Sequence, residues 1–258
     1  MIVRKSRSEL EAMREGGRIT AGCLRMLAGS VRPGVTTKEL DTLAEEFIND
    51  HGGKPEFKGY PGMSSPFPGS ICASPNAMIV HGIPGSYRLK EGDILSIDVG
   101  VRYEGFVTDS ATTVPVGEVP QETTRLLETT RRCLEAATDQ MRTGNHLGDV
   151  GHAIQELAEG RGYGVVRDLV SHGVGRKMHE DPQIPNYGRP GTGPRLLPGM
   201  TFAIEPMITQ GSYDIRLSEL DGWSIYTADG SLAAHFEHTI AVTEDGPWVL
   251  TAYGGEGR

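Results

Sequence analysis

Four carboxylates and one imidazole stand within or beside apolar stretches that are typical of β-strands. They are Asp98 in SIDVG, Asp109 in VTDSA, His172 in SHGVG, Glu205 in FAIEPM and Glu237 in HFEHT. A carboxylate without a partner carries a large desolvation penalty in such surroundings. A pair of divalent cations bound between these side chains would remove that penalty, so the residue types predict a metal centre.

The first two acids flank a predicted β-hairpin. Two β-rich runs meet at a turn near Tyr103 and Glu104. A fold about these two residues would place Asp98 directly opposite Asp109, about 5 Å away, where like charges repel. A proton or a cation must then lie between them. The alternative is that both aspartates are exposed beside the turn, but their apolar neighbours disfavour it.

The five side chains form a donor set dominated by oxygen. Such a set suits Mn, Fe(II) or Co, accepts Zn, and argues against a structural zinc site built from thiolates. Five protein ligands cannot fill two separate coordination shells, so carboxylates would bridge the ions and water would complete the shells. Two ions about 3.5–4 Å apart are typical of two-metal hydrolases. The predicted cofactor is therefore two divalent ions per chain.

Longer motifs surround these residues. They are VHGIP, SHGVGRKMHEDPQIPNYG, FAIEPM and DGWSIYTADGSLAAHFEHT. Together with the paired aspartates, in this order and at these spacings, they resemble the bacterial type I methionine aminopeptidases over essentially all 258 residues. Several motifs in order are more specific than one short pattern. The resemblance implies an enzyme that removes N-terminal methionine from polypeptides whose second residue is small.

The resemblance also implies a role for each metal ligand. Asp109 and Glu237 would bridge the two ions, and Asp98 would complete the shell of one of them. His172 and Glu205 would complete the shell of the other. Glu205 would in addition act as general base and later as proton donor.

Two further histidines resemble residues of the family that contact the substrate. His81, in IVHGIP, and His179, in KMHED, would bind the substrate amide and its developing oxyanion. A single histidine is more often a packed residue or one hydrogen-bonded to solvent. That alternative is weaker here because both histidines lie in matching motifs.

The same similarity implies a pocket for the methionine side chain, lined by Tyr60, Phe67, Cys72, Met178 and Trp223. All of these side chains can pack against a thioether. The alternative for an aromatic residue or a methionine is an ordinary core position. For Cys72 it is a buried strand cysteine.

The chain departs from the family pattern at two places near this site. It reads KGYPGMSSPFPGSIC, about four residues more than is typical. Surface loops tolerate such additions at little free-energy cost; alternatively, the insertion covers the pocket mouth and Met63 reaches inward. His235 stands where glutamine is common. It lies two residues before Glu237 on a predicted strand, so it shares a face with Glu237 and could tune the metal site.

Composition favours an intracellular enzyme. A chain of 258 residues with 37% hydrophobic content can bury a large core as one catalytic domain over 1–258. The N-terminus lacks the apolar segment of a secretory signal, and no run reaches the roughly 18 apolar residues of a membrane span. Three cysteines without CxxC spacing predict neither disulfides nor a zinc knuckle. We expect a soluble, cytoplasmic monomer.

Charge bears on the partners. A net charge of −9 argues against stable nucleic-acid binding, which depends on phosphate neutralisation by Lys and Arg. Basic clusters remain near residues 4–7 and 125–132, and most such clusters are simply solvated surface. They leave room for the weak ribosome contact that the family's cotranslational role would require. The expected substrate is the N-terminal methionine of nascent polypeptides.

Helix signals open the chain. Ser8 and Glu11 form a possible capping box for a helix near 8–28. Thr36 and Glu39 repeat that signature before a second helix, which should stop near Gly52.

Strands are expected over 70–115, followed by helices at about 121–142 and 147–160 and then by a second set of strands. Strands grouped after helices favour an α+β fold with mainly antiparallel sheet. This order occurs twice and predicts two related halves, about 1–120 and 121–258. The resemblance makes the fold specific: a pita-bread (creatinase/aminopeptidase) architecture with two pseudo-symmetric halves, outer helices and the metals in a central cleft.

Two other functions remain open. An Xaa-Pro aminopeptidase or prolidase could use the same fold and ligands, although such relatives usually carry an additional N-terminal domain. A non-catalytic pita-bread protein could act as a scaffold that binds the ribosome or RNA. Such proteins lack the metal ligands, whereas all five are present here.

Overall fold

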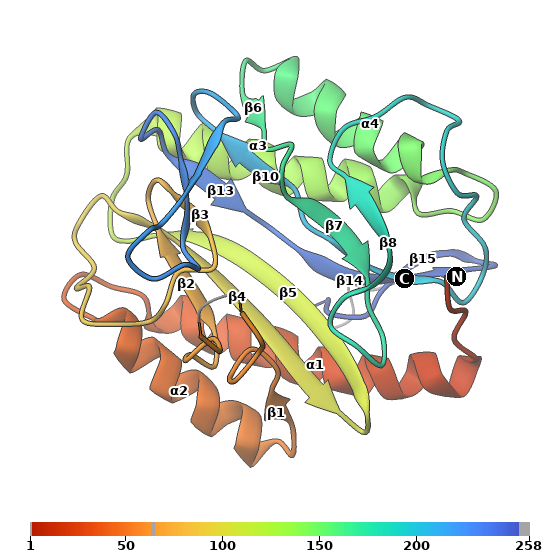
Figure 1. Cartoon of the computed structure of the whole chain (residues 1–258), viewed down its shortest axis with the longest axis horizontal. Coiled ribbons are helices and arrows are strands. Elements are labelled where there is room, and N and C mark those ends of the chain that lie inside the picture. The colour runs from red at the N-terminus through yellow and green to blue at the C-terminus, as the bar shows by residue number, and fades with distance from the viewer. Residues whose placement is uncertain (1, 63–64, 253–258) are drawn as a thin grey trace.

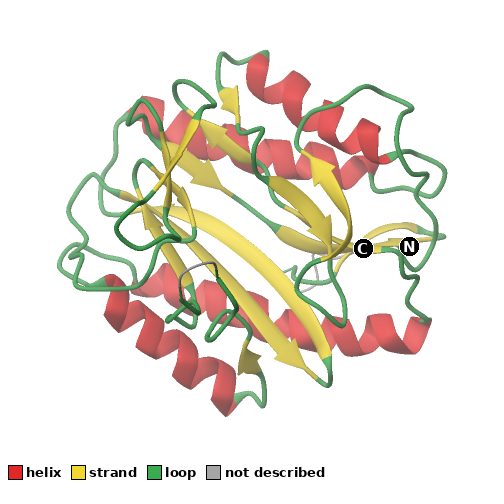
Figure 2. Cartoon of the chain, in the orientation of Figure 1, coloured by secondary structure: helices red, strands yellow, loops and turns green. Residues whose placement is uncertain are grey.

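The computed structural model describes residues 2–62 and 65–252. In this part of the chain four helices lie outside a set of β-strands (Figures 1 and 2). They are α1 (Arg7–Ser30), α2 (Thr37–Asp50), α3 (Gln121–Gln140) and α4 (Leu147–Glu159). In Figure 1, α1 and α2 lie on one side of the strands and α3 and α4 on the other. Among these helices none is both long and apolar enough to cross a membrane.

The strands are short except for one hairpin. They are β1 (Lys54–Pro55), β2 (Cys72–Pro75), β3 (Met78–Val80), β4 (Ile94–Tyr103), β5 (Phe106–Pro115), β6 (Gly164–Val165), β7 (Val170–Gly173), β8 (Glu180–Pro185), β9 (Thr201–Ile204), β10 (Met207–Thr209), β11 (Ile215–Leu217), β12 (Ile225–Thr227), β13 (Ala233–His235), β14 (His238–Thr243) and β15 (Gly246–Val249).

These strands form four sheets. The orders are β1-β4-β2 with β5 beside β4, then β15-β14-β9-β7-β8, β13-β10-β6 and β11-β12-β3. Every strand pair within the described residues is antiparallel. The predicted α+β class with mainly antiparallel sheet is therefore confirmed.

Side-chain caps set the helix starts, and one of them differs from the prediction. For α2 the predicted Thr36 and Glu39 box is present. For α1 the box uses Ser6 and Glu9 instead of Ser8 and Glu11, so the helix begins earlier than expected. Both serines have a glutamate three residues later. The choice between them follows from a long-range contact, because the N–H of Lys5 donates to the Gly199 carbonyl at 2.6 Å and holds the chain extended up to Ser6.

The connections between the paired helices have the same construction on both sides. After α1, the N–H of Gly34 donates to the Leu89 carbonyl at 2.8 Å; after α3, the N–H of Gly144 donates to the Leu196 carbonyl at 3.0 Å. Gly34 and Gly144 have φ values of 92° and 100°, which glycine adopts without strain.

The repeat continues into the strands that carry two of the predicted ligands. Gly92 and Gly199 turn the chain with φ values of 87° and 88°. Asp98 follows the first glycine, and Glu205 follows the second, by the same number of residues. Asp98 lies in β4 and Glu205 follows β9 directly, so equivalent turns deliver both acids.

Two buried apolar clusters hold the helices against the strands. One includes Cys23 of α1 and Ile97 of β4, and the other includes Cys133 of α3 and Phe202 of β9. Removal of these side chains from water is the main stabilising term for such layers. Cys23 and Cys133 are buried and act as small core residues.

Candidate metal centre

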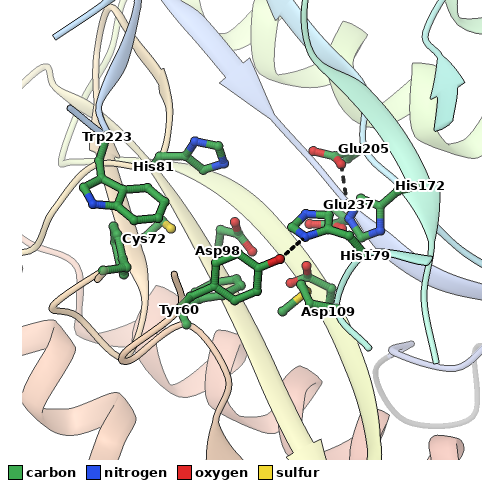
Figure 3. Close-up of a pocket in the computed structure, with 13 residues that line it drawn as sticks. Tyr60, Cys72, His81, Asp98, Asp109, His172, His179, Glu205, Trp223 and Glu237 are labelled. Atoms are coloured by element: carbon green, nitrogen blue, oxygen red, sulfur yellow. Dashed lines mark hydrogen bonds and ion pairs between the residues drawn. The ribbon is translucent and has the colours of Figure 1, made fainter. Parts of the chain in front are cut away.

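One cavity of about 390 Å³ gathers the five predicted metal ligands, the two predicted substrate-contacting histidines and the five predicted methionine-pocket residues. Its lining consists of Tyr60, Phe67, Cys72, His81, Asp98, Asp109, His172, Met178, His179, Glu205, Trp223 and Glu237, together with Phe57. Figure 3 shows these side chains converging from strands and loops that are far apart in the sequence. Phe57 was missed, although it lies three residues before Tyr60 in the same segment.

The β4–β5 hairpin presents Asp98 and Asp109 in a register that differs from the prediction. Glu104 and Gly105 form the turn, with φ values of 47° and 81°. Two left-handed residues are what a two-residue type I′ hairpin requires. The turn therefore lies one residue later than predicted, and Asp98 pairs with Ala111, so direct opposition of the two acids was wrong. Because side chains alternate with period two, the acids still share a face as diagonal neighbours.

Glu237 lies between β13 and β14 and runs beside β5. Its N–H donates to the Ala111 carbonyl at 2.9 Å, and its carbonyl accepts from the Ala111 N–H at 3.3 Å. Thr239 anchors the next contact: its hydroxyl accepts from the Asp109 N–H and donates to the Asp109 carbonyl, both at 2.8 Å. These bonds place the Asp109 and Glu237 carboxylates in the same cavity wall.

His172 in β7 is oriented by its own backbone. Its Nδ1–H donates to the Gly173 carbonyl at 2.8 Å, so Nε2 carries no proton and can bind a metal. Nε2 lies 3.6 Å from Oε1 of Glu205. Burial lowers the pKa of His172 to about 4, which keeps the ring neutral at physiological pH.

Hydrogen bonds to its backbone hold Glu205 in place, and its carboxylate lines the cavity. Its N–H donates to Ser171 Oγ at 2.9 Å, and its carbonyl accepts from Asn186 Nδ2 at 2.9 Å. The Ser171 hydroxyl donates to Asn186 Oδ1 at 3.0 Å and closes the set. Burial raises the pKa of Glu205 to about 8.

The carboxylates face one another with too few donors between them. Within residues 2–62 and 65–252, Asp98 Oδ1, Asp109 Oδ1 and Glu237 Oε1 have no hydrogen-bond partner. Burial, and then the charge of neighbouring carboxylates, raises the pKa of Asp109 to about 7 and the pKa values of the other two well above their ordinary range. Ligand atoms of Asp109, His172 and Glu237 all lie within 4.8 Å of one another. These residues fit divalent cations, whose positive charge would offset the buried negative charge.

Two histidines border the cluster without joining it. His179 is exposed to the cavity; its ring lies 4.4 Å from that of His172, and its Nδ1 is 2.6 Å from the Tyr60 hydroxyl. His81 adopts a left-handed backbone with φ 60°. Burial, then the nearby His235 and His179, lowers the pKa of His81 to about 4. Both rings are placed to contact a ligand in the cavity.

The apolar end of the cavity consists of aromatic and sulfur-containing side chains. Phe67 packs edge-on against Phe57 and against Trp223, at 6.4 and 5.2 Å between ring centroids. Gly100 makes room for this wall. A Cβ at that position would come within 2.5 Å of Met178 and 2.7 Å of Phe57. Such surroundings suit an unbranched apolar side chain.

The flanks of the inserted segment contact the pocket wall. Trp223 Nε1–H donates to the Ser65 carbonyl at 3.1 Å. Gly62 packs against the indole so closely that a Cβ there would lie 2.2 Å from Cζ2. Met63, which one interpretation placed in the pocket, lies outside the described residues. Gly62 and Ser65, on either side of Met63, are exposed, and both contact Trp223.

Comparisons with known proteins agree with this geometry. The sequence profile of metallopeptidase family M24 matches residues 11–244. A methionine aminopeptidase from Clostridium perfringens is 48% identical over 251 residues, which are 97% of this chain and 99% of that protein. The crystal structure of methionine aminopeptidase from Rickettsia prowazekii superposes with a TM-score of 0.95 at 44% identity, covering 98% of this chain and 100% of that one.

The fold is also similar to that of a more distant solved structure. The prolidase from Pyrococcus furiosus has a TM-score of 0.76 and 20% identity, and the match covers 98% of this chain but 66% of that one. At that identity the likeness shows a common fold. The predicted pita-bread architecture is therefore confirmed, and the chain belongs to metallopeptidase family M24.

Proposed function

We propose that this chain is a metalloaminopeptidase that removes the N-terminal methionine of polypeptides whose second residue is small. The observation that supports it most is the single cavity of about 390 Å³, which joins a carboxylate-rich cation site to an apolar, thioether-compatible end. A methionine side chain and a peptide N-terminus need these two environments side by side. The similar proteins from Clostridium perfringens and Rickettsia prowazekii are methionine aminopeptidases, which supports the proposal.

The metal centre that we propose holds two divalent ions. Asp109 and Glu237 would be shared by both ions, Asp98 would serve one of them, and His172 with Glu205 would serve the other. When bound, such ions act as Lewis acids and lower the pKa of water toward 7. Co, Mn, Fe(II) and Zn all accept this donor set.

Glu205 is the proposed proton carrier. Burial raises the pKa of Glu205 to about 8 in the protein without cations, and a neighbouring positive charge would lower it toward neutrality. A carboxyl group whose pKa lies near the working pH can take a proton from water and later give one to the leaving amine. Its fixed backbone keeps the carboxylate in reach of both events.

His179 and His81 are the proposed donors to the substrate. With the Tyr60 hydroxyl donating to His179 Nδ1, the ring proton of His179 would lie on Nε2 and be available to the substrate. A donor in this position stabilises the negative charge that develops on the scissile carbonyl oxygen. His81, from the opposite side of the cavity, would contact the substrate amide (Figure 3).

The proposed selectivity comes from the shape of the cavity. The methionine side chain would lie among Tyr60, Phe67, Cys72, Met178 and Trp223, together with Phe57. A large second residue would collide with the wall as the carbonyl approaches the cations. Small second residues are therefore favoured.

The wider setting is also a proposal. We infer one catalytic domain over 1–258, with related halves of about 1–120 and 121–258, and the repeated Gly34 and Gly144 connections support that division. We further propose a cytoplasmic monomer that acts on nascent polypeptides. Any ribosome contact would be weak, since the net charge is −9.

The test is a peptide assay with purified protein, first stripped of metal and then supplied with Mn, Co, Fe(II) or Zn. Metal-dependent release of methionine from Met-Ala-Ser supports the proposal. Preferential cleavage of Ala-Pro peptides would favour the prolidase alternative. No turnover with any metal would favour a non-catalytic scaffold.

A further inference from the structure

His235 is a buried histidine that the proposed mechanism leaves without a role. It ends β13, and 1% of its surface is exposed. Its N–H donates to Thr113 Oγ1 at 2.9 Å, and the Thr113 hydroxyl donates back to the His235 carbonyl at 2.8 Å. On its other side it pairs with Met207 of β10. Contacts on both edges of the strand therefore set the direction of the imidazole.

That imidazole points one nitrogen at the carboxylate cluster. Nε2 of His235 lies 3.4 Å from Oε2 of Glu205 and 3.9 Å from Oε2 of Glu237. In the part of the chain that the structure describes, this nitrogen has no hydrogen-bond partner. An unsatisfied buried polar atom destabilises the fold, so this nitrogen calls for a partner.

The spacing of these atoms matches a cation site. Ligand atoms of Glu205, His235 and Glu237 all lie within 4.8 Å of one another, the same closeness that the set Asp109, His172 and Glu237 shows. Glu237 belongs to both sets. The carboxylate cluster therefore has two imidazole nitrogens at ligand distance, one from His172 and one from His235.

We infer that His235 is a direct ligand of the divalent ion held by Glu205 and Glu237, which makes the centre a two-imidazole site. This inference rests on the proposed metal centre and adds a sixth protein ligand to it. A second imidazole moves the preference from Mn toward ions that favour nitrogen, such as Zn and Fe(II). A glutamine, common at this position in the resembled family, would offer only an amide.

A competing role for His235 is a hydrogen bond from Nε2–H to the Glu205 carboxylate. Removal of an outer hydrogen bond can itself weaken metal binding by about 10- to 100-fold, so affinity alone does not separate the two roles. The number of imidazoles bonded to metal does. X-ray absorption on zinc-loaded protein measures it directly, because imidazole rings scatter in a characteristic way.

The experiment uses the full chain, stripped and reloaded with two equivalents of Zn. With His172 and His235 both bound, the wild type should show on average about one imidazole per ion, against about one half if His172 alone binds. His235→Gln should lower the count to about one half imidazole per ion. It should also weaken the binding of one of the two ions by at least about tenfold. His238→Gln is the matched control. His238 is half-buried and bonds Thr251 Oγ1 through Nδ1 at 2.9 Å, so its removal should leave the count unchanged.

The wild-type count decides the question even if a variant fails to fold. A count near one half would overturn His235 as a ligand and leave the peptidase proposal intact. A protein that binds no zinc would overturn His235 as a zinc ligand, and turnover with Mn, Co or Fe(II) would then decide the peptidase proposal separately. A count near one that drops in His235→Gln, with His238→Gln unchanged, would establish the assignment.

Discussion

The Tyr60 hydroxyl and Nδ1 of His179 are 2.6 Å apart, in a hydrogen bond that joins two loops far apart in the sequence. A Tyr60 hydroxyl that donates in this bond leaves the ring proton of His179 on Nε2, which is the form able to donate to an oxyanion. Tyr60 is thus both a pocket residue and a positioning residue for His179.

Replacement of Tyr60 by Phe removes the hydroxyl and keeps the ring. We expect kcat to fall about fivefold, since one hydrogen bond contributes about 1 kcal/mol, with metal content unchanged. Steady-state kinetics on Met-Ala-Ser and metal analysis of the same sample test this. An unchanged kcat would show that His179 is oriented by other contacts.

His179→Ala should lower turnover far more while the protein keeps its metal. Loss of an oxyanion donor typically costs about 10²–10³ in rate. Metal analysis shows whether His179 acts as a donor to the oxyanion or as a metal ligand. If metal content fell together with activity, His179 would be a metal ligand and the proposed assignment would be wrong.

Asp109→Ala and Glu237→Ala should each remove more bound metal than His172→Ala. A bridging carboxylate serves two ions, whereas His172 serves one, and all three side chains are buried. Bound metal per chain after gel filtration is the measurement. Full metal retention in Asp109→Ala would refute its bridging role.

Peptide selectivity tests the cavity wall. Met-Ala-Ser and Met-Gly-Ser should be cleaved much faster than Met-Lys-Ser or Met-Phe-Ser. Leu-Ala-Ser should also be poor, although an apolar pocket discriminates by about 1–3 kcal/mol per methylene-sized difference, so its rejection will be incomplete.

Trp223→Ala should relax the second-residue preference if the indole forms part of that wall. Comparable kcat/KM values for Met-Ala-Ser and Met-Phe-Ser in the unmodified enzyme would contradict the proposed selectivity.

Stability of the metal-free protein should fall as pH rises from about 6.5 to about 8. Burial raises the pKa of Asp109 to about 7 and that of Glu205 to about 8, whereas in the unfolded chain both ionise near pH 4. In this window the folded state holds protons that the unfolded state has released, so raising the pH favours unfolding. Below about pH 6.5 the histidines whose pKa values are lowered by burial act in the opposite direction, foremost the buried His172 and His235.

Calorimetric Tm values in chelator, with and without later addition of Mn, test this dependence. Glu205→Gln is the matched control. Its amide cannot ionise, so the Tm of this variant should depend less steeply on pH. Added Mn should stabilise the wild type more at pH 8 than at pH 6.5. A Tm of the metal-free wild type that rises across this window would contradict the assigned pKa shifts.

The sequence by itself determined the residue types and much of the local structure. Buried acids in apolar strands indicated cations, and the Thr36 and Glu39 pair located a helix start, because both signals depend on a few neighbouring residues. Together with motif similarity, they indicated the lining of the cavity except for Phe57.

Tertiary structure decided what depends on distant contacts. The hairpin register followed from left-handed Glu104 and Gly105, which strand alternation does not specify, because a shift of two residues preserves the face. The start of α1 followed from the bond between Lys5 and Gly199. Among the described residues Nε2 of His235 has no hydrogen-bond partner. This could not be predicted from the sequence, because β10, β13 and Thr113 fix the direction of the imidazole, and a side chain gains its neighbours from packing and not from its place in the chain.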